Sequence, residues 1–190
     1  MTPAVDQRER ILGAALELMG ERGVAKTSMR RLASACDLNV ATLYHYFPSK
    51  AELVKALLVE QRYTERLQDD MPAVDPSLPP RERVEALLEF VWSEALSEES
   101  VWRVLLSESI QGDESVRAAI RELIGSLEEG LAAWVADLFP ELEVHQSVAA
   151  PDVGRLLMTT LFSLIVEELA LGRSDAKARG RDLALLLFPA

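Results

Sequence analysis

Apolar residues recur at helical spacing along most of the chain, and short polar or proline-rich stretches separate the periodic segments. The first segment places four apolar residues on one face of a helix: Ile11, Ala15, Leu18 and Met19. This pattern stops near Gly23, a residue type that often ends helices. We therefore predict one amphipathic helix at the amino-terminal end.

Two short helices are predicted next from their capping residues. Thr27 or Ser28 can cap a helix that runs through Ala35. Asn39 can cap another through Tyr46, because its side chain can accept hydrogen bonds from the free amides of a first turn. The two helices are separated by only a tight turn.

A longer helix is predicted to begin at the capping box of residues 49–52 and to run to about Leu67. Residues 68–80 hold four prolines and no periodicity, which predicts a connector. We expect about nine helices in total and an all-α fold, since Ala and Leu dominate the apolar residues. The later periodic segments are residues 84–95, 101–106, 116–134, 151–171 and 175–188.

The composition excludes several classes of protein. At 190 residues and 49% hydrophobic content, the chain can form one large or two small domains. The apolar stretch of residues 156–166 is too short to span a bilayer, and acidic residues within residues 1–20 are unlike a secretory signal, so we expect a cytoplasmic protein. Cys36 is the single cysteine; we expect it to be a small buried residue, with a redox switch as the alternative.

Charge is distributed unevenly along the chain, whose formal net charge is −11. Residues 1–60 hold eight Lys or Arg against seven Asp or Glu, a net charge of +1. Residues 61–190 hold 12 against 24, a net charge of −12. Within residues 22–50, five cations stand against one acid. This small basic segment favours contact with nucleic acid, although a solvated face would have the same pattern.

The segment of residues 27–50 has the layout of a helix-turn-helix motif. Ala33 is small where the two helices would touch, and short side chains on the second helix would let its backbone enter a major groove. The second helix is therefore the candidate reading helix. The apolar contacts between the helices are assigned to Leu32, Cys36, Leu38, Leu43 and Tyr46.

These residues resemble the tetracycline-repressor (TetR) family over residues 6–58. The chain differs in the turn, where Asp37 and Asn39 replace the usual Gly and Ser. The resemblance implies an amino-terminal domain of residues 1–50 that binds DNA, and a carboxy-terminal domain of residues 51–190 that binds ligand and dimerises, with the fourth helix as the link. The matching positions are Gly23-Val24, Thr27-Ser28-Met29, Leu32-Ala33, Leu38-Asn39, Leu43-Tyr44-His45-Tyr46-Phe47, Lys50 and Leu53.

The resemblance also implies roles for single residues. Lys50 matches the lysine that members place on a DNA phosphate at the start of the fourth helix. Tyr46 would serve the small core of the domain as well as the DNA. The candidates for further phosphate contacts are Thr27, Ser28, Tyr44 and Tyr46, and those for base edges are Arg30, Val40, Thr42 and His45.

For the later helices, the resemblance implies a ligand pocket and a dimer interface. Bulky side chains at helical spacing could line the pocket or simply form core, and glutamates within apolar segments would suit a cationic or amphipathic ligand. The bulky candidates are Phe90, Trp92, Trp102, Trp134, Met158 and Phe162, and the glutamates are Glu89, Glu94, Glu108 and Glu167.

The last two helices carry more apolar surface than one neighbour needs, which favours a homodimer. Two copies across a two-fold axis would separate the reading helices by about one DNA turn, roughly 34 Å, so the operator should be an inverted repeat. The interface is assigned to Leu157, Leu161, Leu164, Leu183 and Leu187.

Enzymatic function is the competing class. The chain has no HExxH, GxGxxG, P-loop or nucleophile-elbow spacing, so we expect no catalytic residues and no cofactor or resident metal. The alternative to this expectation is a stray metal site near His145. We expect a repressor that a small apolar molecule releases from double-stranded DNA, and a regulator controlled by a protein partner remains open.

Overall fold

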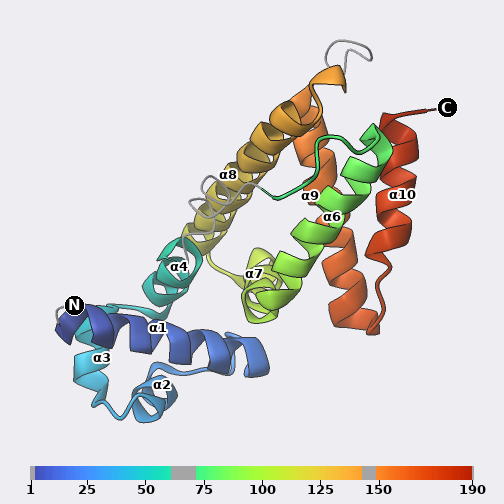
Figure 1. Ribbon diagram of the computed structural model, residues 1–190. Coiled ribbons are helices and arrows are strands. Elements are labelled where there is room, and N and C mark those ends of the chain that lie inside the picture. Colours follow the sequence, from blue (N-terminus) through green and yellow to red (C-terminus); the bar gives the residue numbers. More distant parts are fainter. Residues whose placement is uncertain (1–2, 61–71, 143–148, 190) are drawn as a thin grey trace. The chain divides into compact units, whose positions relative to one another are not determined.

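The structure is a computed structural model that describes residues 3–60, 72–142 and 149–189 (Figure 1). Within these ranges the chain forms nine helices and no strand, which confirms the predicted all-α fold. None of the described helices has a stretch long and apolar enough to cross a membrane. The helices are α1 (Pro3–Arg22), α2 (Met29–Ala35), α3 (Val40–Tyr46), α4 (Lys50–Glu60), α6 (Pro80–Ser97), α7 (Glu99–Gln111), α8 (Glu114–Leu138), α9 (Ala150–Leu171) and α10 (Ala176–Leu187).

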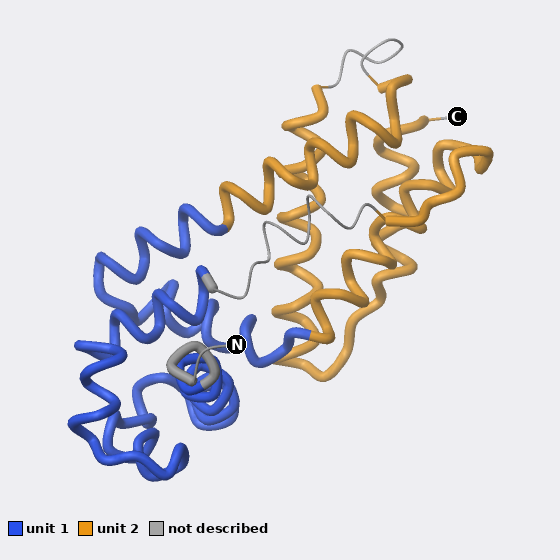
Figure 2. The backbone as a smooth tube through the Cα atoms, turned by 60° about the vertical axis from the view of Figure 1, so that its left-hand side comes forward, with its two compact units in different colours: residues 1–62, 98–123 blue, residues 63–97, 124–190 orange. Residues whose placement is uncertain are grey.

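The chain divides into two compact units (Figure 2). The first unit comprises residues 1–62 and 98–123, and the second comprises residues 63–97 and 124–190. Helix α7 and the first part of α8 therefore group with the helix-turn-helix segment. The compact units thus differ from the predicted division at residue 50, because α4 and α7 both pack against α1.

In the first unit, α1 is the central helix and contacts α2, α4 and α7. Ile11, Ala15 and Met19 of α1 are buried, as their spacing predicts. The contact with α7 depends on Gly20: a Cβ there would lie 2.8 Å from Cβ of Ser100, closer than real side chains approach. A residue without a side chain thus lets α1 and α7 come together.

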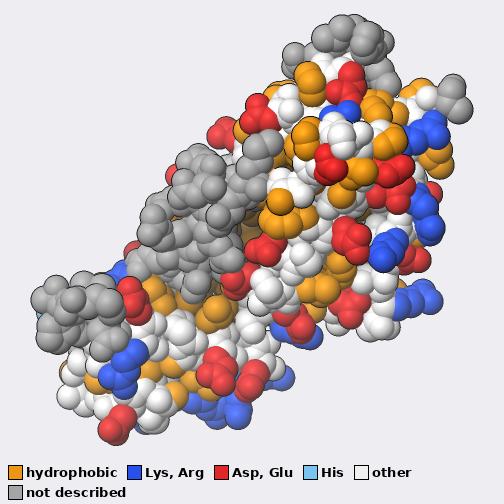
Figure 3. Space-filling model, in the orientation of Figure 1, with side chains coloured by type: hydrophobic (Ala, Val, Ile, Leu, Met, Phe, Trp, Pro, Cys, Tyr) orange, Lys and Arg blue, Asp and Glu red, His pale blue; other side chains and the backbone are white. Residues whose placement is uncertain are grey.

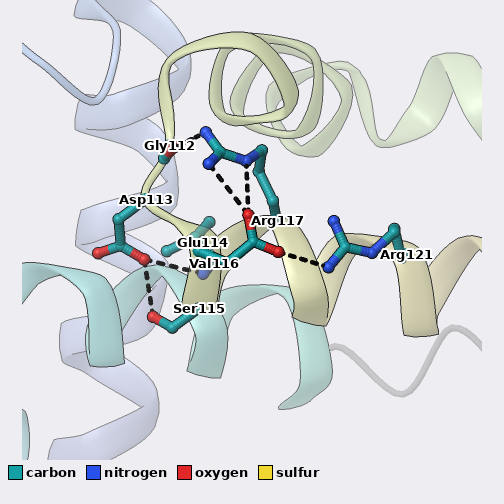
Figure 4. Close-up of polar contacts among 7 residues, drawn as sticks. All are labelled: Gly112, Asp113, Glu114, Ser115, Val116, Arg117 and Arg121. Atoms are coloured by element: carbon teal, nitrogen blue, oxygen red, sulfur yellow. Dashed lines mark hydrogen bonds and ion pairs between the residues drawn. The ribbon is translucent and has the colours of Figure 1, made fainter.

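The α7–α8 corner, defined as residues 108–117, is held by a local polar network (Figure 4). Asp113 caps α8: its Oδ1 accepts hydrogen bonds from the Ser115 hydroxyl at 2.7 Å and from the Val116 amide at 3.0 Å. The Arg117 guanidinium donates to the carbonyl of Gly112 and to the Glu114 carboxylate. These contacts hold the turn between α7 and the start of α8.

In the second unit, α6 packs against α10 and α9. Arg83 of α6 is buried, and its guanidinium donates to the carbonyls of Leu78 and Leu138 and forms an ion pair with Glu141. The same guanidinium lies 5.3 Å from the ring centre of Phe139. A buried arginine with these partners is satisfied, so it joins the start of α6 to the end of α8.

Candidate nucleic-acid interface

Helix α3, the predicted reading helix, is fixed by one buried residue and one cap. Among its seven residues, all of which the structure describes, Leu43 alone is buried. The Asn39 side chain accepts a hydrogen bond from the Thr42 amide at 2.7 Å, which opens the helix as predicted. The remaining surface of α3, including Ala41 and His45, faces solvent in whole or in part. Helix α3 therefore presents small and polar side chains outward.

The turn between α2 and α3 passes through Asp37, whose φ of 56° lies in the left-handed region. The amide of Leu38 then donates to the carbonyl of Ala33 at 2.8 Å, which closes the turn. Asp therefore adopts the conformation that glycine usually supplies at this position. Cys36, at the end of α2, is buried as predicted, and burial raises the pKa of its thiol.

Helix α2 is capped by Ser28, whose Oγ accepts a hydrogen bond from the Arg31 amide at 3.2 Å. The Arg30 and Arg31 side chains are exposed, and the guanidinium of Arg31 donates to the carbonyl of Lys26 at 3.1 Å. Figure 3 shows both Lys or Arg and Asp or Glu side chains in the lower part of the first unit. Ser28 and Arg30 are thus exposed to solvent at the start of α2.

Thr27 does not take the place predicted for it. Only 1% of its surface is exposed, and its hydroxyl is within hydrogen-bonding distance of the carbonyls of Leu18 at 3.2 Å and Gly23 at 3.1 Å. Its amide donates to the carbonyl of Val24. Both donors of Thr27 are therefore engaged inside the unit, and its assignment to a phosphate is corrected to a structural role in the turn after α1.

The remaining candidates for DNA contact differ in the exposure and the hydrogen bonding of their side chains. The Thr42 hydroxyl donates to Asn39 Oδ1 at 2.9 Å, so base recognition by Thr42 is left to its methyl group and oxygen lone pair. Tyr44 is 46% exposed, and Val40 is half-buried beside the cap. His45 is exposed and meets the half-buried ring of Tyr46 edge to face, with 5.8 Å between the ring centres.

Lys50 is the first residue of α4 and is half-buried. The preceding Ser49 accepts a hydrogen bond from the Glu52 amide at 3.1 Å, in line with the predicted capping box. Burial lowers the pKa of Lys50, and the charge of Glu108 acts in the opposite direction. Sequence reasoning missed this neighbour, because 57 residues lie between the two positions and no local pattern joins them.

The six bulky ligand candidates belong to both compact units. Phe90 and Trp134 meet edge to face, with 5.9 Å between their ring centres. Trp92 and Met158 are buried in the second unit, where Phe162 is half-buried. Trp102 is buried too, but it belongs to the first unit. The structure thus brings together Phe90 and Trp134, and Trp102 is assigned to a different compact unit from the other five candidates.

The four glutamates of the apolar segments also differ. Glu89 and Glu94 are exposed, and Glu167 accepts a hydrogen bond from the Arg179 guanidinium at 2.8 Å. Glu108 is buried, with 8% of its surface exposed. Among the described residues, no cluster of three His, Cys, Asp or Glu could hold a metal ion, and His145 lies outside them.

The predicted dimer residues are corrected by their burial within a single chain. Leucines of α9 and α10 that were assigned to the interface form the core of the protomer itself: Leu157, Leu161, Leu164, Leu183 and Leu187. The two helices are apolar on more than one side, so the sequence pattern alone could not tell the inner face from the outer one. The large apolar side chains that α9 and α10 expose are Leu156, Val166, Leu171, Leu185 and Leu186.

Comparison with known proteins identifies the motif. Residues 11–57 match the family model of the bacterial regulatory proteins of the tetR family. The chain is 24% identical to the HTH-type transcriptional regulator UidR of Escherichia coli K12 over 186 residues, which cover 94% of this chain and 91% of that one. It is 30% identical to the HTH-type transcriptional repressor KstR of Rhodococcus jostii over 128 residues, 67% of this chain and 58% of that protein.

Solved structures share the fold along nearly the whole chain. The transcriptional regulator FadR from Bacillus subtilis, solved in complex with stearoyl-CoA, superposes with a TM-score of 0.74 at 17% identity, covering 95% of this chain and 97% of that one. The multidrug binding protein EbrR, solved with ethidium, has a TM-score of 0.69 at 21% identity, covering 97% and 99%. The chain belongs to the TetR family of bacterial regulatory proteins and is a transcriptional regulator with a helix-turn-helix domain.

Proposed function

We propose that this regulator binds an inverted-repeat operator as a homodimer and represses transcription until a small apolar or amphipathic molecule releases it. The observation that carries the DNA half of this proposal is the exposure of α3, with Leu43 as its one buried anchor. A helix anchored in this way can enter a major groove without disturbing the core. Since its target is chromosomal DNA, we place the protein in the cytoplasm.

The DNA-binding face combines two kinds of contact. Lys50 and Ser28 bind phosphates and set the register, together with the phenols of Tyr44 and Tyr46. Sequence is read by Arg30 and by the side chains of α3, namely Val40, Thr42 and His45. In functional terms, residues 1–50 are the reading domain and α4 links it to the rest of the chain.

Selection of bound duplexes from a random pool tests the DNA proposal. The purified protein should enrich an inverted repeat whose half-site centres lie about one helical turn, or slightly more, apart. Enrichment of a single half-site without symmetry would contradict the dimer. Recovery of no common sequence would contradict operator recognition altogether.

The effector is proposed to be apolar or amphipathic and to bind among the helices of the second unit. The contact between Phe90 and Trp134 supports an aromatic lining. FadR was solved with stearoyl-CoA and EbrR with ethidium, so the same fold accommodates an acyl chain in one protein and an aromatic ligand in another. Effector binding would favour a spacing of the two reading helices that no longer fits successive major grooves.

A two-step measurement tests the effector. Acyl-chain and aromatic cationic compounds are first screened for a rise in melting temperature. Each stabilising compound is then added to the protein bound to its selected operator, where we expect affinity to fall roughly 5- to 150-fold. Stabilisation with unchanged operator affinity would contradict the inducer proposal and favour control by a protein partner.

The dimer is proposed to form through the outer face of α9 and α10, defined as Leu156, Thr160, Val166, Leu185 and Leu186. The four apolar members of this face are exposed in the single chain, and Leu186 has 74% of its surface in solvent. Exposed apolar side chains on two consecutive helices favour a partner with the same face.

A further inference from the structure

Among the nine described helices, α8 alone belongs to both compact units. Its residues 114–123 lie in the first unit, and its residues 124–138 lie in the second. Each of the other eight described helices lies in a single unit. In Figure 2 the colour of the tube changes within this helix. A continuous helix therefore joins the unit that holds the helix-turn-helix to the unit in which the effector is proposed to bind.

The two ends of α8 are packed into their units, but its middle is not. None of residues 124–130, all of which the structure describes, is buried. Helical spacing would place Leu127 on the buried face, yet it is only half-buried. The buried apolar side chains of the first part are Val116, Ile120 and Leu123, and those of the second part are Leu131, Trp134, Val135 and Leu138.

Within the second unit, α9 holds the backbone of α8 again from Glu128 onward. A Cβ at Gly154 of α9 would lie 2.9 Å from the Glu128 carbonyl oxygen and 2.9 Å from the Ala132 amide nitrogen. Real side chains do not approach so closely, so the two backbones are in direct contact at this point. The loosely packed stretch of α8 is therefore residues 124–127, directly after the last buried residue of the first unit, Leu123.

Gly125 lies in this stretch, where neither packing nor backbone conformation requires a glycine. A Cβ there would meet no atom of a neighbouring element within 4 Å. The glycines with positive φ among the described residues are Gly23 and Gly172, so Gly125 has an ordinary helical backbone. Glycine weakens a helix interior relative to alanine, and helices bend at Gly-Ser pairs such as the one that Gly125 forms with Ser126. The helix is thus easiest to bend where it passes from one unit to the other.

We propose that α8 bends at Gly125 and that this bend lets the second unit reorient relative to the first. The buried side chains on either side keep each part of α8 fixed within its own unit, so the motion is confined to the stretch between them. In the proposed function, an effector changes the spacing of the reading helices, and the bend carries this change from one unit to the other. That link rests on the proposed function, whereas the bend itself does not.

Distances between spin labels in the two units measure the bend directly. Nitroxides are attached to Glu21→Cys in α1 and Lys177→Cys in α10, both exposed positions, in a Cys36→Ala background. The labelled chain is mixed with an excess of unlabelled chain, so that the measured distances lie within one protomer. The distance distribution should be broader with glycine at position 125 than in Gly125→Ala. Equal widths would overturn the bend.

A second pair of labels, within the first unit, is the control for local disturbance. Glu21→Cys and Ala118→Cys are both exposed, and both lie in the first unit. Gly125→Ala should leave their distance distribution unchanged, because position 125 does not lie between them. A change in this pair would mean that the substitution alters the first unit itself, which would contradict a local bend.

Gly13→Ala is the matched substitution. Gly13 lies inside α1, within the first unit, and a Cβ there would also meet no neighbouring atom within 4 Å. Either substitution should raise the melting temperature by about 2–4 °C, because alanine favours a helix over glycine. Only Gly125→Ala should narrow the distances between units. A lower melting temperature for Gly125→Ala would mean that position 125 is closely packed, which would contradict the bend.

The response to the effector separates the bend from the proposed function. The fall in operator affinity on effector binding, roughly 5- to 150-fold in the wild type, should be several-fold smaller in Gly125→Ala and unchanged in Gly13→Ala. If no compound lowers the operator affinity of the wild type, the inducer proposal is wrong, and the label distances still test the bend. If the distances narrow while Gly125→Ala responds like the wild type, the bend stands and its link to the effector is wrong.

Discussion

Helix α3 and the outer face of α9 and α10 are both turned to solvent, yet they expose opposite kinds of side chain. Helix α3 exposes Ala41, Tyr44 and His45 around one buried leucine. The outer face exposes aliphatic residues such as Leu185 and Leu186. Polar and small groups suit contact with base edges and phosphates, whereas apolar groups suit a protein surface of the same kind. The difference assigns one surface to DNA and the other to a second copy of the chain.

The largest effect on operator binding is expected from a charged substitution in the outer face of α9 and α10. Leu186→Asp should give monomers and weaken operator binding by about 100-fold or more, because two linked reading helices bind far more tightly than one. Sedimentation and operator titration measure the two effects. Ile110→Asp is the control: Ile110 is 82% exposed on α7 and belongs to the first unit, so its variant should remain a dimer.

Charges placed on the inner face of the same helices should act differently. Leu161 is buried in the protomer, so Leu161→Asp puts an unpaired charge into the core and should abolish folding rather than dimerisation alone. Circular dichroism distinguishes the two outcomes. A folded Leu161→Asp monomer would mean that Leu161 belongs to the dimer interface and not to the core of the protomer.

A smaller effect is expected when a reading residue is removed. Arg30→Ala should cost about 1–3 kcal/mol on the best operator and reduce the preference among sequences. Arg31→Ala is the matched control, since the Arg31 guanidinium is bonded to the Lys26 carbonyl, and it should change binding less and equally for all duplexes. Equal losses from Arg30→Ala on specific and random duplexes would remove Arg30 from the base-reading set.

Thr27 separates structural from DNA-binding roles within the motif. Thr27→Val removes the hydroxyl that contacts the carbonyls of Leu18 and Gly23, so the free energy of unfolding should fall by about 1–2 kcal/mol. At a temperature where the variant is folded, the salt slope of operator binding should be unchanged. A shallower slope with unchanged stability would restore Thr27 as a phosphate contact.

The smallest effect is expected from the charge of Glu108 on stability. Its pKa is raised in the folded state, so the folded protein gains stability as the pH falls and loses it as the pH rises through the raised value. Glu108→Gln removes this cost, and its melting temperature should exceed that of the wild type at neutral pH. The gap should close below the ordinary glutamate pKa of 4.5. A gap that widens in acid would have the wrong sign.

Local patterns predicted the fold well, because caps and apolar spacing act over a few residues. Asn39, Ser49 and the turn at Asp37 lie where their local chemistry predicts. Facts that depend on packing could not be predicted in this way. The spacing of α9 shows apolar residues but not that Leu157 points inward, and no pattern reveals that Trp102 groups with the helix-turn-helix segment.

Prediction of the candidate site from the sequence is limited in the same way, even for adjacent residues. Thr27 and Ser28 are adjacent hydroxyl residues before one helix, and either could cap it. Packing against α1 buries Thr27 and leaves Ser28 as the cap, so their roles separate only in three dimensions.

The ratio of two dissociation constants tests most directly whether α3 reads a defined operator. The protein is titrated at one salt concentration onto the selected inverted repeat and onto a scrambled duplex of the same length. We predict a dissociation constant for the selected repeat at least roughly 1,000-fold lower than for the scrambled duplex. Equal affinity for both duplexes would contradict sequence-specific regulation by this chain.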